Sequence, residues 1–140
     1  MATKLLTLEV TTPLGLAPRT ECEFVEAPSV KGEFGVFPGH LPVLAALRSG
    51  LLKYKSSGKV HVAALGPGFV EAEPGHVNVL SDLFATAKDI DRKETEAELT
   101  AASAALADYK EAYVGADYEE LQRSVDWARA KLLCLDRAKA

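Results

Sequence analysis

The chain changes character near residue 88. All seven prolines and nine of the ten glycines lie between residues 13 and 75. Both residue types favour turns and interrupt helices, so this part cannot be built from long helices. From residue 88 onward there is no proline, and alanine is the commonest residue. We therefore expect strands and turns over residues 1–87 and helices over residues 88–140.

Two turn signals organise the first region. Ser57-Gly58 and Pro74-Gly75 each lie between two short apolar runs, which is the pattern of a β-hairpin. In residues 4–10, apolar and polar residues alternate with the two-residue period of a half-buried strand. We expect a β-sandwich or flattened barrel of about ten short strands. The inward residues expected in the first two strands are Leu6, Leu8 and Val10 in residues 4–10, and Cys22 and Phe24 in residues 21–27.

Two amphipathic helices are expected in the second region. Asp91 and Glu94 have the spacing of a helix cap followed by a carboxylate, and Asp117 and Glu120 repeat it after a break at Gly115. A short break between two helices favours an antiparallel hairpin. A strand-rich region followed by a helical hairpin makes the expected fold class α+β. Apolar residues at steps of three and four define one face of each helix: Leu99, Ala102, Leu106, Tyr109 and Tyr113, then Tyr118, Leu121, Val125, Ala128, Leu132 and Leu135.

The first of these helices is rich in alanine. Alanine lets helices pack closely but buries little apolar area per residue. We expect the hairpin to be held to the rest of the chain only modestly and to be able to move.

Composition excludes several classes of protein. The formal net charge is −4, whereas nucleic-acid binders depend on a basic surface. Cys22 and Cys134 are far apart in sequence, so neither zinc nor a disulfide framework is expected, and a reducing compartment fits. The apolar runs are too short to span a bilayer, and residues 1–10 do not have the pattern of a signal peptide.

No catalytic pattern stands out. His61 and His76 have no ligand partners at metal-binding spacing, and the serines lack a nucleophile-elbow motif. No glycine-rich phosphate-binding motif is present. The sequence therefore predicts a protein that is not itself an enzyme, with no catalytic residue, metal or cofactor.

Residues 31–42 combine glycine and proline with apolar side chains. Their letters are KGEFGVFPGHLP. Turn chemistry alone accounts for every glycine and proline, which makes this a short strand between two turns. The alternative is a rigid exposed loop that offers Glu33 and His40 to a partner. The residues by themselves leave both interpretations open.

This stretch resembles the GEFGxxPGHxPxL signature of the ε subunit of F-type ATP synthases, whose mitochondrial counterpart is called δ. The resemblance covers almost the whole chain and keeps the order of its pieces. Besides the alanine-rich helix pair, the matching pieces are residues 5–13, 32–44, 65–71 and 77–82.

The resemblance implies a rotor subunit of the central stalk of a proton-translocating ATP synthase. Family members bind the γ subunit and the c-subunit ring through the sandwich and help to couple ring rotation to γ. Their C-terminal helices lie on the sandwich or extend along γ into the α/β catalytic head, where they block ATP hydrolysis. The resemblance further implies a peripheral position on the cytoplasmic face of the inner (plasma) membrane.

Residue by residue, the resemblance assigns Lys31 and Glu33 to the c-ring contact and His40 and Ala45 to the γ contact. Four basic residues of the second helix would meet acidic surfaces of the catalytic head in the extended, inhibitory form. They are Arg123, Arg129, Lys131 and Arg137.

Some bacterial members bind ATP at a motif of Ile/Leu-Asp-x-x-Arg-Ala. Ile90 and Asp91 match this motif, but Glu94 stands in place of the arginine and Thr95 in place of the alanine. A carboxylate repels phosphate, so we expect no ATP binding and interpret Asp91 as a helix cap. A nucleotide-sensing protein remains the alternative function, with candidate residues Ile90, Asp91, Arg92, Arg123 and Arg129.

Overall fold

Strands fill the first region and helices the second, as the turn and alanine patterns predict. The structure is a computed structural model that describes residues 4–16, 19–109 and 116–138. The described strands are β1 (Leu6–Thr12), β2 (Gly15–Leu16), β3 (Thr20–Cys22), β4 (Phe24–Ser29), β5 (Gly32–Val36), β6 (Val43–Leu47), β7 (Gly50–Ser56), β8 (Lys59–Leu65), β9 (Gly68–Glu73), β10 (His76–Ser81) and β11 (Phe84–Thr86).

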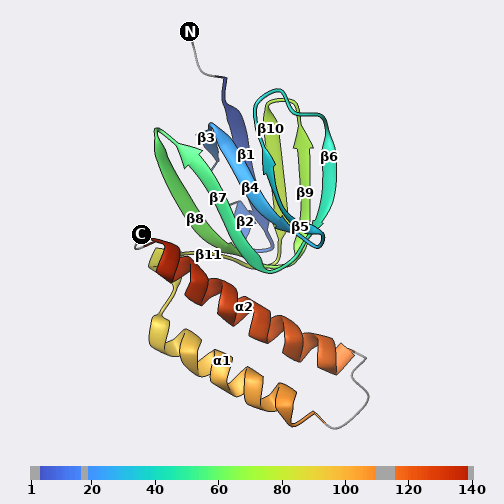
Figure 1. The fold of residues 1–140 in the computed structure, drawn as a ribbon, viewed down its shortest axis with the longest axis vertical. Coiled ribbons are helices and arrows are strands. Elements are labelled where there is room, and N and C mark those ends of the chain that lie inside the picture. Colours follow the sequence, from blue (N-terminus) through green and yellow to red (C-terminus); the bar gives the residue numbers. More distant parts are fainter. Residues whose placement is uncertain (1–3, 17–18, 110–115, 139–140) are drawn as a thin grey trace.

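These strands form one sheet that curls around a single core (Figure 1). Its main path runs β11-β8-β7-β4-β6-β9-β10-β1-β2, with β3 paired to β1 and β5 paired to β4. β1 and β10 are parallel, and the other pairs are antiparallel. Leu6, Leu8 and Val10 are buried in the core, which confirms the alternation read in residues 4–10.

Both predicted hairpins are present. The β7–β8 turn places Ser57 at φ 53° and Gly58 at φ 78°, the two left-handed positions that a tight hairpin of this twist requires. Gly75 has φ 78° in the β9–β10 turn. The turn residues therefore set the registers of these two strand pairs.

The strand expected over residues 21–27 is wrong in one respect. The chain breaks at Glu23, whose backbone N–H donates to the Lys55 carbonyl at 2.7 Å, and β3 and β4 are separate strands. The break shifts the alternation by one residue, so Cys22 and Val25 are buried. Phe24 is only half-buried and lies against Phe37, with ring centroids 5.8 Å apart. A one-residue slip sends every following side chain to the other face.

The second region contains a short 3₁₀ turn, η1 (Ala87–Asp89), and two helices, α1 (Arg92–Ala107) and α2 (Ala116–Ala138). α2 lies between the sandwich and α1 (Figure 1). It rests on β7 and β8 through small residues: Ala130 and Cys134 form an apolar cluster with Leu51 and Ala64. Ala130 and Cys134 are not in the predicted stripe, so α2 has a second apolar face that the periodicity did not reveal.

The start of α2 differs from the expectation. Asp117 is the second residue of the described helix, not a cap in front of it, and its carboxylate lies in the first turn. An acidic residue there still complements the positive end of the helix dipole. Tyr113 and the expected break at Gly115 lie outside the described residues.

Replacing Asp91 by alanine should lower the free energy of unfolding by about 1 kcal/mol. The Asp91 side chain accepts the Glu94 backbone N–H at 2.8 Å, as the cap prediction required, and alanine leaves that donor without its partner. Chemical denaturation measures the change. Asp108→Ala, at the other end of α1, is the matched control and should be neutral, because a carboxylate at a helix C-terminus gives no dipole stabilisation. Equal losses in the two variants would contradict the capping role.

Candidate interaction surfaces on the sandwich and the helix pair

The signature stretch forms β5 and the loops at its two ends. Lys31 and Glu33 lie at the β4–β5 turn, and both are exposed. Ser29 holds this turn: its Oγ donates to the Gly32 carbonyl at 2.6 Å and accepts the Lys31 N–H at 3.1 Å. The two charged side chains predicted to contact the c ring thus lie on a rigid, solvent-facing corner.

His40 lies in the loop after β5, at the opposite end of that strand from Glu33. Its Nδ1 is 2.8 Å from the Leu41 carbonyl, so Nδ1 carries the donated proton. The Nε2 atom is buried and has no hydrogen-bond partner among the described residues. One polar atom of the ring is therefore left without a hydrogen-bond partner inside this part of the chain.

Ala45 lies in β6, and its side chain packs against the sandwich core. Its neighbour Leu44 is 70% exposed. On the adjoining strands, Phe69 of β9 pairs with Ala46 of β6 and with Leu80 of β10. Phe69 and Leu80 are also exposed apolar side chains. We call Leu44, Phe69 and Leu80 the β6–β9–β10 surface. This surface was not predictable from the sequence, because single exposed apolar residues give no periodic signal.

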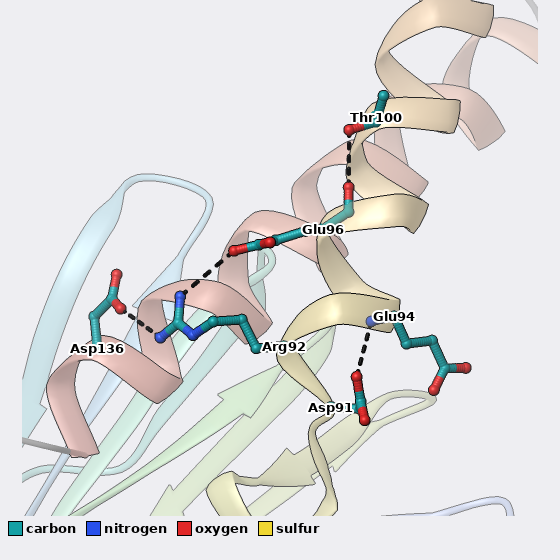
Figure 2. A network of polar contacts seen from close by, with 6 residues as sticks. All are labelled: Asp91, Arg92, Glu94, Glu96, Thr100 and Asp136. Carbon is teal, nitrogen blue, oxygen red and sulfur yellow. Dashed lines mark hydrogen bonds and ion pairs between the residues drawn. The ribbon is translucent and has the colours of Figure 1, made fainter.

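Two of the helix-pair candidates for ATP binding, Asp91 and Arg92, are engaged within the hairpin (Figure 2). Arg92 donates to Asp136 of α2 at 2.7 Å and lies 3.9 Å from Glu96, while Asp91 caps α1. Arg123 is 13 positions before Asp136 on α2, or about 20 Å along the axis. The structure therefore does not bring Arg92 and Arg123 together. Ile90 packs into the apolar cluster beneath α2.

The four basic residues assigned to an inhibitory helix are not equivalent. Lys131 pairs with Glu98 of α1 at 2.7 Å, and only 14% of its side chain is exposed. Its ammonium also lies 5.6 Å from the ring centre of Trp127. Arg123, Arg129 and Arg137 are exposed. In this arrangement Lys131 ties the two helices together, and the three arginines face solvent.

The thiols in the described part of the chain are not activated. Burial raises the pKa of Cys22 to about 11, and burial also raises the pKa of Cys134. Burial, with a smaller contribution from Cys22, raises the pKa of Tyr54. Raised values keep these groups protonated at neutral pH, so they are poor nucleophiles. No group of three His, Cys, Asp or Glu side chains within the described ranges is arranged to hold a metal ion.

Neither α1 nor α2, over the residues described, is long and apolar enough to cross a membrane.

Comparison with known proteins agrees with this architecture. The family model for the β-sandwich domain of the ATP synthase delta/epsilon chain matches residues 5–87. The ATP synthase epsilon chain of Nitratidesulfovibrio vulgaris strain DP4 is 36% identical over 129 residues, covering 92% of this chain and 94% of the relative. The epsilon chain of Bacillus subtilis is 34% identical over 94 residues, covering 67% of this chain and 71% of the relative.

Solved structures share the fold. A chain in the mitochondrial ATP synthase of Euglena gracilis, from a structure of its OSCP, F1 and c-ring, superposes with a TM-score of 0.78 at 18% identity. The match covers 98% of this chain and 82% of that one. A chain from the central stalk and c-ring of the Tetrahymena thermophila enzyme gives 0.56 at 12% identity, with full coverage of both.

Fold and surfaces together define a β-sandwich that carries a two-helix hairpin and presents a signature loop to solvent. The chain belongs to the family of F-type ATP synthase epsilon chains.

Proposed function

We propose that this chain is a non-catalytic central-stalk subunit of a proton-translocating ATP synthase. In this role it couples rotation of the c-subunit ring to the γ shaft, at the cytoplasmic face of the inner (plasma) membrane. The observation that carries the proposal is the exposed signature stretch in a chain of this family: Lys31 and Glu33 form one solvent-facing corner, and His40 lies at the far end of the same strand.

The two ends of β5 suit two different partners. The corner at Lys31 and Glu33 offers two exposed charges beside the exposed side chain of Val30, which suits orientation against polar loops of the c ring. His40 offers a nitrogen that lacks a partner in the described residues, and the β6–β9–β10 surface offers apolar area. Contiguous exposed apolar side chains mark protein interfaces, so we assign this side to the γ subunit, with Leu44 protruding beside Ala45.

The hairpin has the contacts expected of a detachable inhibitor of ATP hydrolysis. Two ion pairs join α1 to α2 in the described part of the hairpin, Arg92–Asp136 and Lys131–Glu98. Among the described residues no ion pair joins it to the sandwich, and its apolar contact consists of Ala130 and Cys134 together with the partly buried side chains of Ile90 and Trp127. In the extended form, Arg123, Arg129 and Arg137 would face the α/β catalytic head, and Lys131 would join them after leaving Glu98.

Glu33→Lys should weaken ATP-driven proton pumping partially while the complex still assembles. The substitution reverses the charge that this corner would present to the polar loops of the c ring. An exposed ion pair contributes about 0–1 kcal/mol, so loss of coupling should be incomplete. Proton pumping by membrane vesicles, measured beside ATP hydrolysis, gives the result.

The matched control is Glu21→Lys. Glu21 is an exposed glutamate on β3, outside the signature stretch, and the substitution makes the same change in charge. Pumping that is unchanged by Glu33→Lys, or reduced equally by both variants, would remove the c-ring assignment of this corner.

A further inference from the structure

A basic pocket lies where the end of the hairpin meets the edge of the sandwich. It has a volume of about 380 Å³ and is lined by residues of β7, β8, β11, η1 and the last turn of α2. Figure 1 shows the C-terminal end of α2 beside these strands. Its charged and aromatic lining consists of Tyr54, His61, Lys88 and Arg137. Among the residues that the structure describes, no acidic side chain lines it.

The pocket exists because β11 is short. β11 pairs only with residues 63–65 of β8, so residues 60–62 have no strand neighbour on that side among the described residues. The pocket opens beside this stretch, and Tyr54 and His61 close one wall as a stacked pair with ring centres 5.1 Å apart. Two facing strands thus hold the His61 ring in a fixed position.

The positive charge in the pocket is not neutralised by its neighbours. Asp89, next to Lys88, accepts hydrogen bonds from the backbone and hydroxyl of Thr86. Asp136, next to Arg137, is paired with Arg92. Neither Lys88 nor Arg137 has an ion pair within the described residues. The carboxylates that would ordinarily compensate these two cations are therefore held elsewhere.

The helix dipole does not cancel this charge. The C-terminal end of α2 carries a partial charge equivalent to about −0.5, whereas Lys88 and Arg137 each carry a full positive charge. Lysine and arginine together, converging from separate elements, form a common arrangement for binding phosphate groups. His61 adds a third hydrogen-bonding group from the sandwich.

We propose that this pocket binds a small phosphate-bearing polyanion, such as pyrophosphate. The ligand would contact His61 of the sandwich, Lys88 of the connecting turn and Arg137 of the hairpin at the same time. Binding therefore favours the arrangement in which α2 lies on β7 and β8, because a ligand stabilises the state that holds its whole site. This site is separate from the helix-pair candidates Asp91 and Arg92, which are engaged within the hairpin.

Calorimetric titration of the full chain with inorganic pyrophosphate at low salt tests the proposal. We expect one saturable site, and a rise in the melting temperature on addition of the ligand. Lys88→Gln and Arg137→Gln should each weaken binding about tenfold or more, because each removes a charged hydrogen-bond donor. The Lys88 and Arg137 side chains are exposed, so both variants should fold normally. Their melting temperatures without ligand measure this.

Two matched variants separate a built pocket from general attraction to a basic surface. Lys93→Gln and Arg19→Gln remove the same charges from exposed positions outside the pocket and should leave affinity within about twofold, a small difference on the free-energy scale. Absence of binding at millimolar pyrophosphate would overturn the proposal, as would equal losses in all four variants. The titration uses the isolated chain, so its outcome is independent of the proposed role in the central stalk.

Discussion

Removing residues 88–140 should raise ATP hydrolysis by the assembled complex several-fold, while assembly and ATP synthesis remain largely intact. The sandwich keeps its own core, because the buried cluster from Leu6 to Val79 contains no hairpin residue. The truncation exposes the face of β7 and β8 that α2 covers, at Leu51, Val62 and Ala64. The measurement is ATPase activity of the purified complex over a range of ATP concentrations. Hydrolysis that falls or does not change would mean that the hairpin is a structural brace.

A reversible version of this experiment uses a cysteine that the chain already has. The Cys134 thiol lies 3.8 Å from the Val62 carbonyl oxygen, across the contact between α2 and β8. In a Val62→Cys variant, oxidation should pin the hairpin to the sandwich and raise hydrolysis as truncation does. Adding a reductant should restore the inhibited rate. Val62→Ser, which cannot form the disulfide, is the matched control and should respond to neither treatment.

Gly68→Ala should destabilise the sandwich by about 3 kcal/mol or more, at or above the upper end of the usual cost of overpacking. A Cβ built on Gly68 would lie 1.9 Å from the Leu80 carbonyl oxygen and 3.0 Å from the Ser81 Cα. These are backbone atoms of the neighbouring strand, so they cannot move aside without breaking the β9–β10 pairing. This cost is a large fraction of the total stability of a typical domain.

Denaturant unfolding measures the effect, with Gly35→Ala as the control. A Cβ on Gly35 would lie 3.3 Å from the Phe37 ring, whose side chain is exposed and able to shift, and 3.9 Å from the Val25 carbonyl oxygen, which is an ordinary contact. Comparable midpoints for the two variants would show that β9 and β10 separate more easily than their contact implies.

Local features of the fold were predictable because their causes are local. Ser57-Gly58 and Pro74-Gly75 specify turns, the alternation at residues 4–10 specifies a buried face, and Asp91 specifies the start of α1. The exposure of Glu33 at a turn follows from the same chemistry. Each of these needs information from only a few neighbouring residues.

The remaining features depend on contacts between distant parts of the chain. Nothing local predicts the parallel pairing of β1 with β10, or that Arg92 would pair with Asp136. The second apolar face of α2 was not predicted, because alanine, the residue at position 130, is as common on exposed faces of helices as on buried ones. The break at Glu23 depends on a hydrogen bond to Lys55, which is far away in sequence. The basic pocket likewise exists only once α2 lies beside β8.

The central claim is that this chain couples the c ring to the catalytic head, and add-back to depleted membranes tests it most directly. Vesicles that contain the ATP synthase without this chain should pump protons poorly when ATP is supplied. Adding the full chain should restore pumping, and adding the Glu33→Lys variant should restore it only in part. Pumping that is equally efficient with and without the chain would contradict the account.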